Sequence, residues 1–299
     1  MSIILFLIIG YFVLFLFTPK GTVVHEMLHI PNFWIRNLSV SKKNLLTRKI
    51  KFGQLRQQYF IFCQPKKSVP LKKHAILYFH GGGWMAGTPE ILTAAGQLFA
   101  DNGYVSVFSN YRKAPFFSYP DMREDISSCL KKLDEYLKQE NLNIDKFIIG
   151  GMSAGANLAA LLALDEEELK KINIAPNQIR GVFLSGSPVD LNQMIWSIPL
   201  YLYAGKRSGE NFQKANPINY LSKTNFPPIL MIHGNKDGLV PFRNTTTFLK
   251  KINAINPNLA KMHFIENGTH MNTASWSYEN NDVRKAILDW LAEREAELE

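Results

Sequence analysis

The segment Gly151-Met152-Ser153-Ala154-Gly155 constrains the fold of this chain more than any other part of its sequence. It follows a compact apolar run at 146–149 and opens a helical stretch at 154–164. A serine flanked by glycines at this spacing predicts a sharp strand-to-helix turn that lifts the serine hydroxyl above the end of a sheet. Glycine at both flanks lets neighbouring backbone approach without a clashing Cβ. We therefore predict that Ser153 is a nucleophile.

The rest of the chain alternates short apolar runs with helical stretches, which is typical of an α/β fold. The pattern predicts a mostly parallel sheet with helices on both faces, whose ligand site lies at the carboxyl ends of the strands. The expected strands are 45–51, 57–62, 75–79, 104–108, 146–149, 181–184, 229–232 and 262–265. One expected helix begins at Thr88-Pro89, and the others cover 121–139, 154–164, 243–255 and 282–298.

A second glycine-rich segment, His80-Gly81-Gly82-Gly83-Trp84, comes directly after the expected strand at 75–79. Acyl transfer needs N–H donors at the place where the substrate carbonyl oxygen becomes negative. We expect the amides of Gly82, Gly83 and Ala154 to form this oxyanion hole, because glycines leave the backbone N–H groups unobstructed. His80 is then expected to hold the loop rather than to act as the base.

The acid and the base are predicted from the strand ends. Asp237 follows the expected strand at 229–232, and His270 lies in a loop after the last strand. The chain order Ser153, Asp237, His270 is the order of a nucleophile, an orienting acid and a base on a sheet of this kind. Asp190 is the weaker alternative for the acid. This site predicts acyl transfer to water through an acyl-enzyme intermediate, with no metal and no organic cofactor.

The motifs together resemble the hormone-sensitive-lipase-like, carboxylesterase branch of the α/β-hydrolase superfamily, over about residues 72–297. The resemblance rests on 80–84, on 151–155, and on Tyr111-Arg112-Lys113-Ala114-Pro115 with Tyr119-Pro120 and Asp125. The sequence departs from this branch at Phe116, where many members have Glu, and it lacks the usual D-P-L-type acid segment. The acid region is instead similar to that of peptidase-like and feruloyl-esterase-like relatives, so the subfamily stays open. The resemblance implies an α/β-hydrolase fold with a short cap region and a small-molecule ester or lipid substrate.

Three other functions remain as alternatives. The first is an amidase or peptidase on the same triad, and the segment 80–84 also fits the motif of an arylformamidase-like amidase. A non-catalytic receptor of this fold would have lost the histidine, whereas this chain keeps His270. The segment His25-Glu26-Met27-Leu28-His29 is an H-E-x-x-H motif typical of zinc metalloproteases. Pro31 is expected to stop its helix, and no third ligand is evident, so a zinc protease is the least favoured interpretation.

The N-terminal end predicts a membrane anchor. Residues Ile3 to Phe17 are apolar throughout, no Lys or Arg precedes them, and no small-residue cleavage site follows. Residues 1–73 also carry twelve Lys or Arg against one acidic residue, in a chain of net charge +9. Basic charge beside an apolar run favours an anionic membrane surface over nucleic acid. We therefore expect a single-pass anchor over 1–20, a connector or cap over 21–44, and a catalytic domain over 45–299 on the cytosolic side.

The residues between the expected strands at 181–184 and 229–232 bear on the substrate. The insertion at about 190–225 is small, which predicts a preference for short or medium acyl chains. Residues 191–203 include Met194, Ile195, Trp196, Leu200 and Tyr201, which either line an acyl pocket or cover the core.

Overall fold

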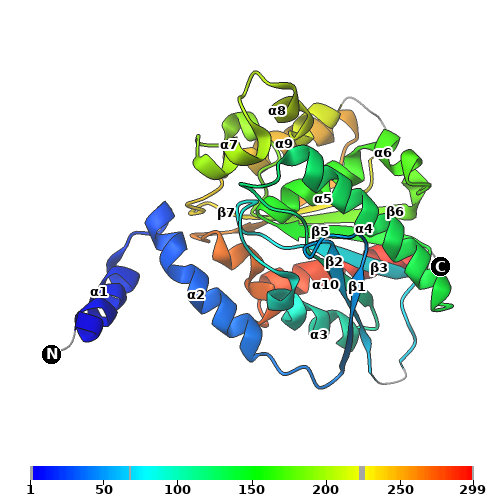
Figure 1. Cartoon of the computed structure of the whole chain (residues 1–299), viewed down its shortest axis with the longest axis horizontal. Helices are drawn as coiled ribbons and strands as arrows, with labels where there is room; N and C mark the ends of the chain where they lie inside the picture. Colours follow the sequence, from blue (N-terminus) through cyan, green and yellow to red (C-terminus); the bar gives the residue numbers. More distant parts are fainter. Residues whose placement is uncertain (1–2, 67–68, 222–225, 298–299) are drawn as a thin grey trace.

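An eight-stranded sheet forms the centre of the molecule (Figure 1). The structure is a computed structural model that describes residues 3–66, 69–221 and 226–297. The strands lie in the order β1-β2-β4-β3-β5-β6-β7-β8, in which β1 and β2 are antiparallel to their neighbours and the others are parallel. They are β1 (Leu45–Lys51), β2 (Tyr59–Pro65), β3 (His74–Phe79), β4 (Val105–Ser109), β5 (Lys146–Met152), β6 (Ile179–Ser185), β7 (Ile229–Gly234) and β8 (Ala260–Ile265).

Helices cover both faces of this sheet, as the alternating pattern predicts. One hydrophobic core lies under α4, α5, α6 and α9, and the other lies under α2, α3, η5 and α10. The α-helices are α1 (Ile3–Phe17), α2 (Val23–Ser39), α3 (Thr93–Asp101), α4 (Tyr119–Gln139), α5 (Ala154–Leu164), α6 (Glu166–Lys171), α7 (Ile198–Ala204), α8 (Glu210–Lys214), α9 (Arg243–Ile255) and α10 (Asp282–Ala296). The 3-10 helices are η1 (Pro89–Leu92), η2 (Pro176–Gln178), η3 (Leu191–Gln193), η4 (Pro217–Tyr220) and η5 (Met271–Ser277).

The strand register decides which loops meet. Phe79, the last residue of β3, pairs with Gly151 of β5, and Met152 of β5 pairs with Ser185 of β6. The loops that follow β3, β5 and β6 therefore leave the sheet side by side at its carboxyl edge. This is the edge where parallel α/β sheets bind ligands.

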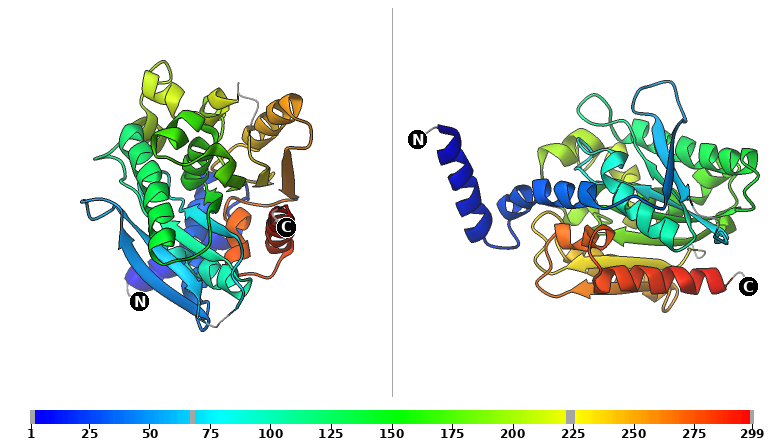
Figure 2. Two further views of the ribbon diagram at one scale, coloured as in Figure 1. Left: turned by 90° about the vertical axis from the view of Figure 1, so that its right-hand side faces the viewer. Right: turned by 90° about the horizontal axis from the view of Figure 1, so that it is seen from below.

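The predicted membrane anchor is wrong. Helix α1 projects away from the body of the molecule (Figures 1 and 2) and has 15 residues. At 1.5 Å per residue it is about 22 Å long, whereas the hydrocarbon core of a bilayer is about 30 Å thick. Among the described residues, no helix combines the length and the apolar character that a membrane span needs. The cytosolic placement of the catalytic domain, which depended on that anchor, is not supported either.

The expectation that Pro31 stops its helix is also wrong. Helix α2 continues through Pro31 to Ser39. Proline removes one backbone hydrogen bond, to the carbonyl of the residue four positions earlier. Here that residue is Met27, and both Met27 and Pro31 lie on the exposed side of the helix, where water can reach the freed carbonyl. On the opposite side Phe33 and Asn37 are buried, so tertiary packing maintains the helix beyond the proline.

Candidate active site

Ser153 occupies the sharp turn between β5 and α5. Its backbone has φ +54° and ψ −123°, a left-handed conformation that is strained for a residue with a side chain. The Ser153 N–H donates to the carbonyl of Ser185 at 2.8 Å, which ties the turn to the end of β6. The side chain is half-buried. Ser153 therefore lies at the carboxyl edge of the sheet, where the nucleophile is expected.

The two glycines of the turn are explained by close backbone contacts. A Cβ on Gly155 would lie 2.2 Å from the carbonyl oxygen of Phe79, and a Cβ on Gly151 would lie 2.3 Å from that of Gly155. Real Cβ atoms do not approach carbonyl oxygens this closely, so only glycine fits at either position. The turn is thereby packed directly against the end of β3, where the loop of residues 80–84 begins.

The loop of residues 80–84 lies against Ser153. A Cβ on Gly81 would be 3.2 Å from Cβ of Ser153, and Gly82 and Gly83 have φ values of +127° and +59°. The carbonyl of Gly82 accepts hydrogen bonds from the two amides that close the turn, those of Met85 and Ala86. Ala154 begins α5, so its N–H has no acceptor within the helix. The structure thus brings the segments that carry Gly82, Gly83 and Ala154 together beside Ser153.

His80 holds this loop. Its Nδ1 lies 2.7 Å from the carbonyl of Gly81, and its Nε2 lies 3.2 Å from the side chain of Asn110. The ring stacks on Tyr111 with 4.5 Å between centroids, and the Tyr111 hydroxyl donates to the carbonyl of His80 at 2.9 Å. Burial, and after it the nearby Lys113 ammonium, lower the pKa of His80 to about 4. His80 is therefore neutral, and its ring contacts are directed to the loop.

Asp237 and His270 are joined directly. His270 Nδ1 donates to Oδ2 of Asp237 at 2.7 Å. The other oxygen of this carboxylate, Oδ1, accepts from the backbone N–H groups of Leu239 at 2.9 Å and Val240 at 2.8 Å. The buried His233 adds a contact of 3.3 Å from its Nε2 to Oδ2. Contacts other than that with His270 therefore hold both carboxylate oxygens of Asp237 in place.

The electrostatics of this pair follow from burial and from each partner. Burial by itself would raise the pKa of Asp237, but His270 and His233 outweigh it and hold that pKa well below its usual value. Burial by itself would lower the pKa of His270, but the Asp237 carboxylate raises it above the ordinary value, and Glu26 adds to this increase. The pair therefore favours a charged aspartate beside a histidine that binds a proton readily.

The other ring nitrogen of His270, Nε2, is buried and neither accepts nor donates a hydrogen bond within the described residues. The ring packs on the turn after β6, because a Cβ on Gly186 would lie 2.8 Å from Cε1 of His270. Gly186 directly follows Ser185, whose carbonyl binds the Ser153 amide. The base candidate and the nucleophile candidate therefore flank the same short segment, although no hydrogen bond joins them.

The residues of two alternative interpretations make other contacts. Asp190, the weaker candidate for the acid, caps η3 by accepting from the N–H of Asn192, and it also accepts from Gln193. His25 and His29 of the H-E-x-x-H motif stack on each other with 4.0 Å between ring centroids. Among the described residues, no group of three or more His, Cys, Asp or Glu side chains could hold a metal ion. The zinc interpretation therefore finds no third ligand in this part of the chain.

Sequence reasoning missed one residue at the site. Glu26, the second residue of that same motif, is fully buried and accepts a hydrogen bond from the backbone N–H of His270 at 2.8 Å. The available signal was a glutamate in the first turn of a helix, but nothing local indicates its partner.

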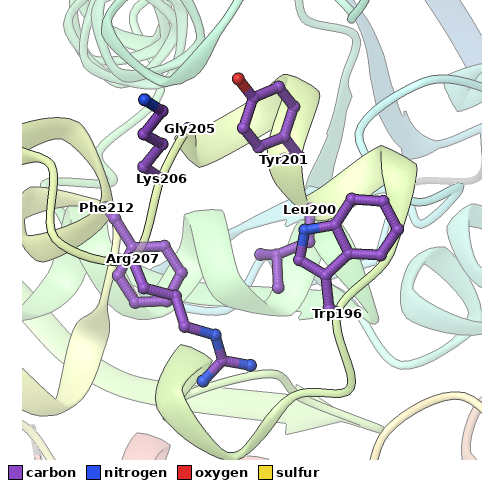
Figure 3. Close-up of a pocket in the computed structure, with 7 residues that line it drawn as sticks. All are labelled: Trp196, Leu200, Tyr201, Gly205, Lys206, Arg207 and Phe212. Carbon is purple, nitrogen blue, oxygen red and sulfur yellow. The ribbon is translucent and has the colours of Figure 1, made fainter.

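The segment between β6 and β7 forms a pocket. Helix α7 contacts this loop, since Trp84 stacks on Tyr203 with 4.4 Å between ring centroids. The cavity has a volume of about 210 Å³ and is seen in Figure 3, lined by Trp196, Leu200, Tyr201, Gly205, Lys206, Arg207 and Phe212. Of the side chains that the sequence singled out here, Trp196, Leu200 and Tyr201 line this pocket.

Comparison with known proteins agrees with the fold and the motifs. The chain is 23% identical over 248 residues to the isoprenylcysteine α-carbonyl methylesterase ICME of Arabidopsis thaliana, covering 77% of this chain and 58% of that protein. It is 24% identical over 221 residues to esterase LipC of Mycobacterium tuberculosis, covering 64% of this chain and 51% of that one. The chain thus spans between about half and three fifths of the length of these curated relatives.

Solved structures show the same architecture. Esterase B from Lactobacillus rhamnosis superposes with a TM-score of 0.75 at 19% identity, covering 91% of this chain and 92% of that one. A hormone-sensitive lipase from a metagenome library gives a TM-score of 0.67 at 19% identity, covering 88% and 91%. The expected α/β-hydrolase fold is therefore confirmed. The BD-FAE family model matches residues 61–252, which is more than half of the sequence, and we conclude that this α/β-hydrolase chain belongs to the BD-FAE family.

Proposed function

We propose that this protein is a serine carboxylesterase in which Ser153 is the nucleophile, His270 the base and Asp237 the orienting acid. The observation that carries the proposal is the 2.7 Å hydrogen bond from His270 Nδ1 to Asp237 Oδ2. It places the proton on Nδ1 and leaves Nε2 as an acceptor, which is the tautomer that a general base needs. The names of the relatives, which include a methylesterase and esterases, support the same reaction class.

In this mechanism His270 Nε2 takes the hydroxyl proton as Ser153 Oγ attacks the ester carbonyl carbon. The amides of Gly82, Gly83 and Ala154 donate to the oxyanion that forms. The tetrahedral intermediate then expels the alcohol, which receives its proton from His270. Water, activated by the same nitrogen, hydrolyses the acyl-enzyme and restores Ser153. Asp237 stays ionised throughout and stabilises the transient imidazolium.

The substrate that we propose is an ester with a short or medium acyl chain. In the described part of the segment between β6 and β7, the α-helices are short, α7 with 7 residues and α8 with 5. A small cap leaves little chain to enclose a long acyl group. The mainly apolar pocket beside α7, with Trp196 and Leu200 in its lining, is the candidate region for the acyl chain.

Hydrolysis of p-nitrophenyl esters by the wild type and by Ser153→Ala tests the function. We expect turnover in the wild type, and a loss of several orders of magnitude in the variant without a change in its melting temperature. A fluorophosphonate should label Ser153, as peptide mass spectrometry would show. An arylformamide assayed in parallel separates esterase from amidase activity. Equal turnover by the two proteins, or labelling of a different serine, would contradict the assignment.

A further inference from the structure

Glu26 connects the two loops that carry the candidate acid and base. It lies in the first turn of α2 and has no solvent exposure. Its Oε1 accepts from the backbone N–H of His270 at 2.8 Å and from that of Gly238 at 3.1 Å. Gly238 is the neighbour of Asp237 in sequence. One carboxylate oxygen therefore binds backbone groups on both loops, although 244 residues separate Glu26 from His270.

We propose that Glu26 is a positioning residue of the active site, whose carboxylate holds the His270 loop against the Asp237 loop and whose charge stabilises the protonated form of His270. This inference rests on the proposed function, because it concerns the same base and acid. It also gives a role to the glutamate of the H-E-x-x-H motif that needs no metal.

The packing of α2 shows that this contact is built into the fold. A Cβ on Gly238 would lie 2.5 Å from the carbonyl oxygen of Thr22, so the start of α2 is pressed directly onto the Asp237 loop. Thr22 also caps the helix, accepting from the N–H of His25 at 3.2 Å. The N-terminus of a helix carries a partial positive charge, which favours a carboxylate in its first turn. Glu26 is thus fixed at one end by the helix and at the other by the catalytic loops.

The second oxygen of Glu26 indicates that the charge itself has a use. Oε2 is buried and finds no hydrogen-bond partner among the described residues. Burying a carboxylate with an unpaired oxygen is costly, and a glutamine could accept the same two backbone hydrogen bonds without a charge. The titratable groups that face His270 are Asp237 and, through it, His233 from the loop and strand end of β7, and Glu26 from α2. Glu26 is therefore the second carboxylate close enough to stabilise an imidazolium at His270.

The test compares Glu26→Gln and Glu26→Ala with the wild type. Glu295→Gln is the matched control, because Glu295 is another buried carboxylate that accepts a backbone N–H, from Lys73, but far from the site. Glutamine preserves the two backbone hydrogen bonds and removes the charge, whereas alanine removes both. We expect Glu26→Gln to shift the acidic limb of the kcat/KM profile to lower pH. We expect Glu26→Ala to lower kcat by about 10- to 100-fold with little change in KM, since misplaced catalytic groups cost rates of this order.

A histidine NMR titration in the Ser153→Ala background separates this inference from the proposed function. There the pKa of His270 should fall on Glu26→Gln and stay unchanged on Glu295→Gln, whether or not the wild type hydrolyses esters. An unchanged His270 titration in a folded Glu26→Gln variant would overturn the electrostatic role. A Glu26→Ala variant with wild-type kcat would overturn the positioning role, and if that variant does not fold, the glutamine variant still decides the first question. If the wild type shows no ester turnover, or turnover that Ser153→Ala does not abolish, the proposed function is refuted instead.

Discussion

Replacing Asp237 with asparagine tests the acid assignment most sharply, because the structure dictates how the amide must orient. Oδ1 accepts from two backbone N–H groups, those of Leu239 and Val240. In Asp237→Asn the amide oxygen has to remain on that side, since an NH2 group there would face two donors. The amide nitrogen then points to His270 Nδ1, which forces the histidine proton onto Nε2. The base then offers Ser153 a proton instead of an acceptor.

The expected loss in kcat is about 10⁴-fold, the size measured when a triad aspartate is replaced by asparagine with the geometry kept. At 1.36 kcal/mol per factor of ten, this corresponds to about 5.4 kcal/mol of activation free energy. The substitution should disturb the contacts of His233 more than the backbone hydrogen bonds to Oδ1. The Nε2 of His233 lies near both Oδ2 of Asp237 and the carbonyl of Val240. We therefore expect a small decrease in melting temperature with a native circular dichroism spectrum.

The assay is steady-state hydrolysis of a short p-nitrophenyl ester, with Asp190→Asn as the matched control. Asp190 is the other aspartate that follows a central strand, and asparagine can still accept from the N–H of Asn192. The control should retain kcat within a few-fold. A folded Asp237→Asn enzyme within tenfold of wild type would refute the tautomer argument, and a larger loss in Asp190→Asn would transfer the acid role to Asp190.

Three further predictions follow from the same site. The kcat/KM should fall as the pH decreases, with an apparent pKa above the ordinary histidine value of 6.5. The reason is that Asp237 raises the pKa of His270, and the base is active only when it is neutral. A pH–rate profile whose acidic limb lies below 6.5 would contradict this. Gly155→Ala should destabilise the fold by about 1–3 kcal/mol or more in chemical denaturation, because its Cβ would meet the carbonyl of Phe79, whereas Gly10→Ala has open space around it and should not. Rates on esters of graded acyl length should be highest for short or medium chains, and a maximum on emulsified long-chain triglyceride would refute the small-cap argument.

Local sequence patterns determined most of the secondary structure of this protein. The strand β1 and the helices α5 and α9 have the bounds that the sequence predicts, and the other strands differ by one to three residues at their ends. This works because a strand buried on both faces needs a continuous apolar run, and because the turn at Ser153 tolerates only glycine at its flanks. The same patterns predicted which loops follow which strands, and hence that Ser153, Asp237 and His270 lie at one edge of the sheet. Their catalytic roles stay predictions.

Only the tertiary structure decided how helix α2 in the N-terminal quarter of the chain ends and which loops it contacts. Pro31 locally predicts a helix end, but α2 continues because Phe33 and Asn37 are buried against the body of the molecule. Glu26 has no local feature that indicates its partner, and its contact with His270 exists only because α2 docks on loops more than 200 residues away. Periodicity and turn chemistry act over a few residues, whereas contacts of this kind depend on how whole helices pack on the sheet.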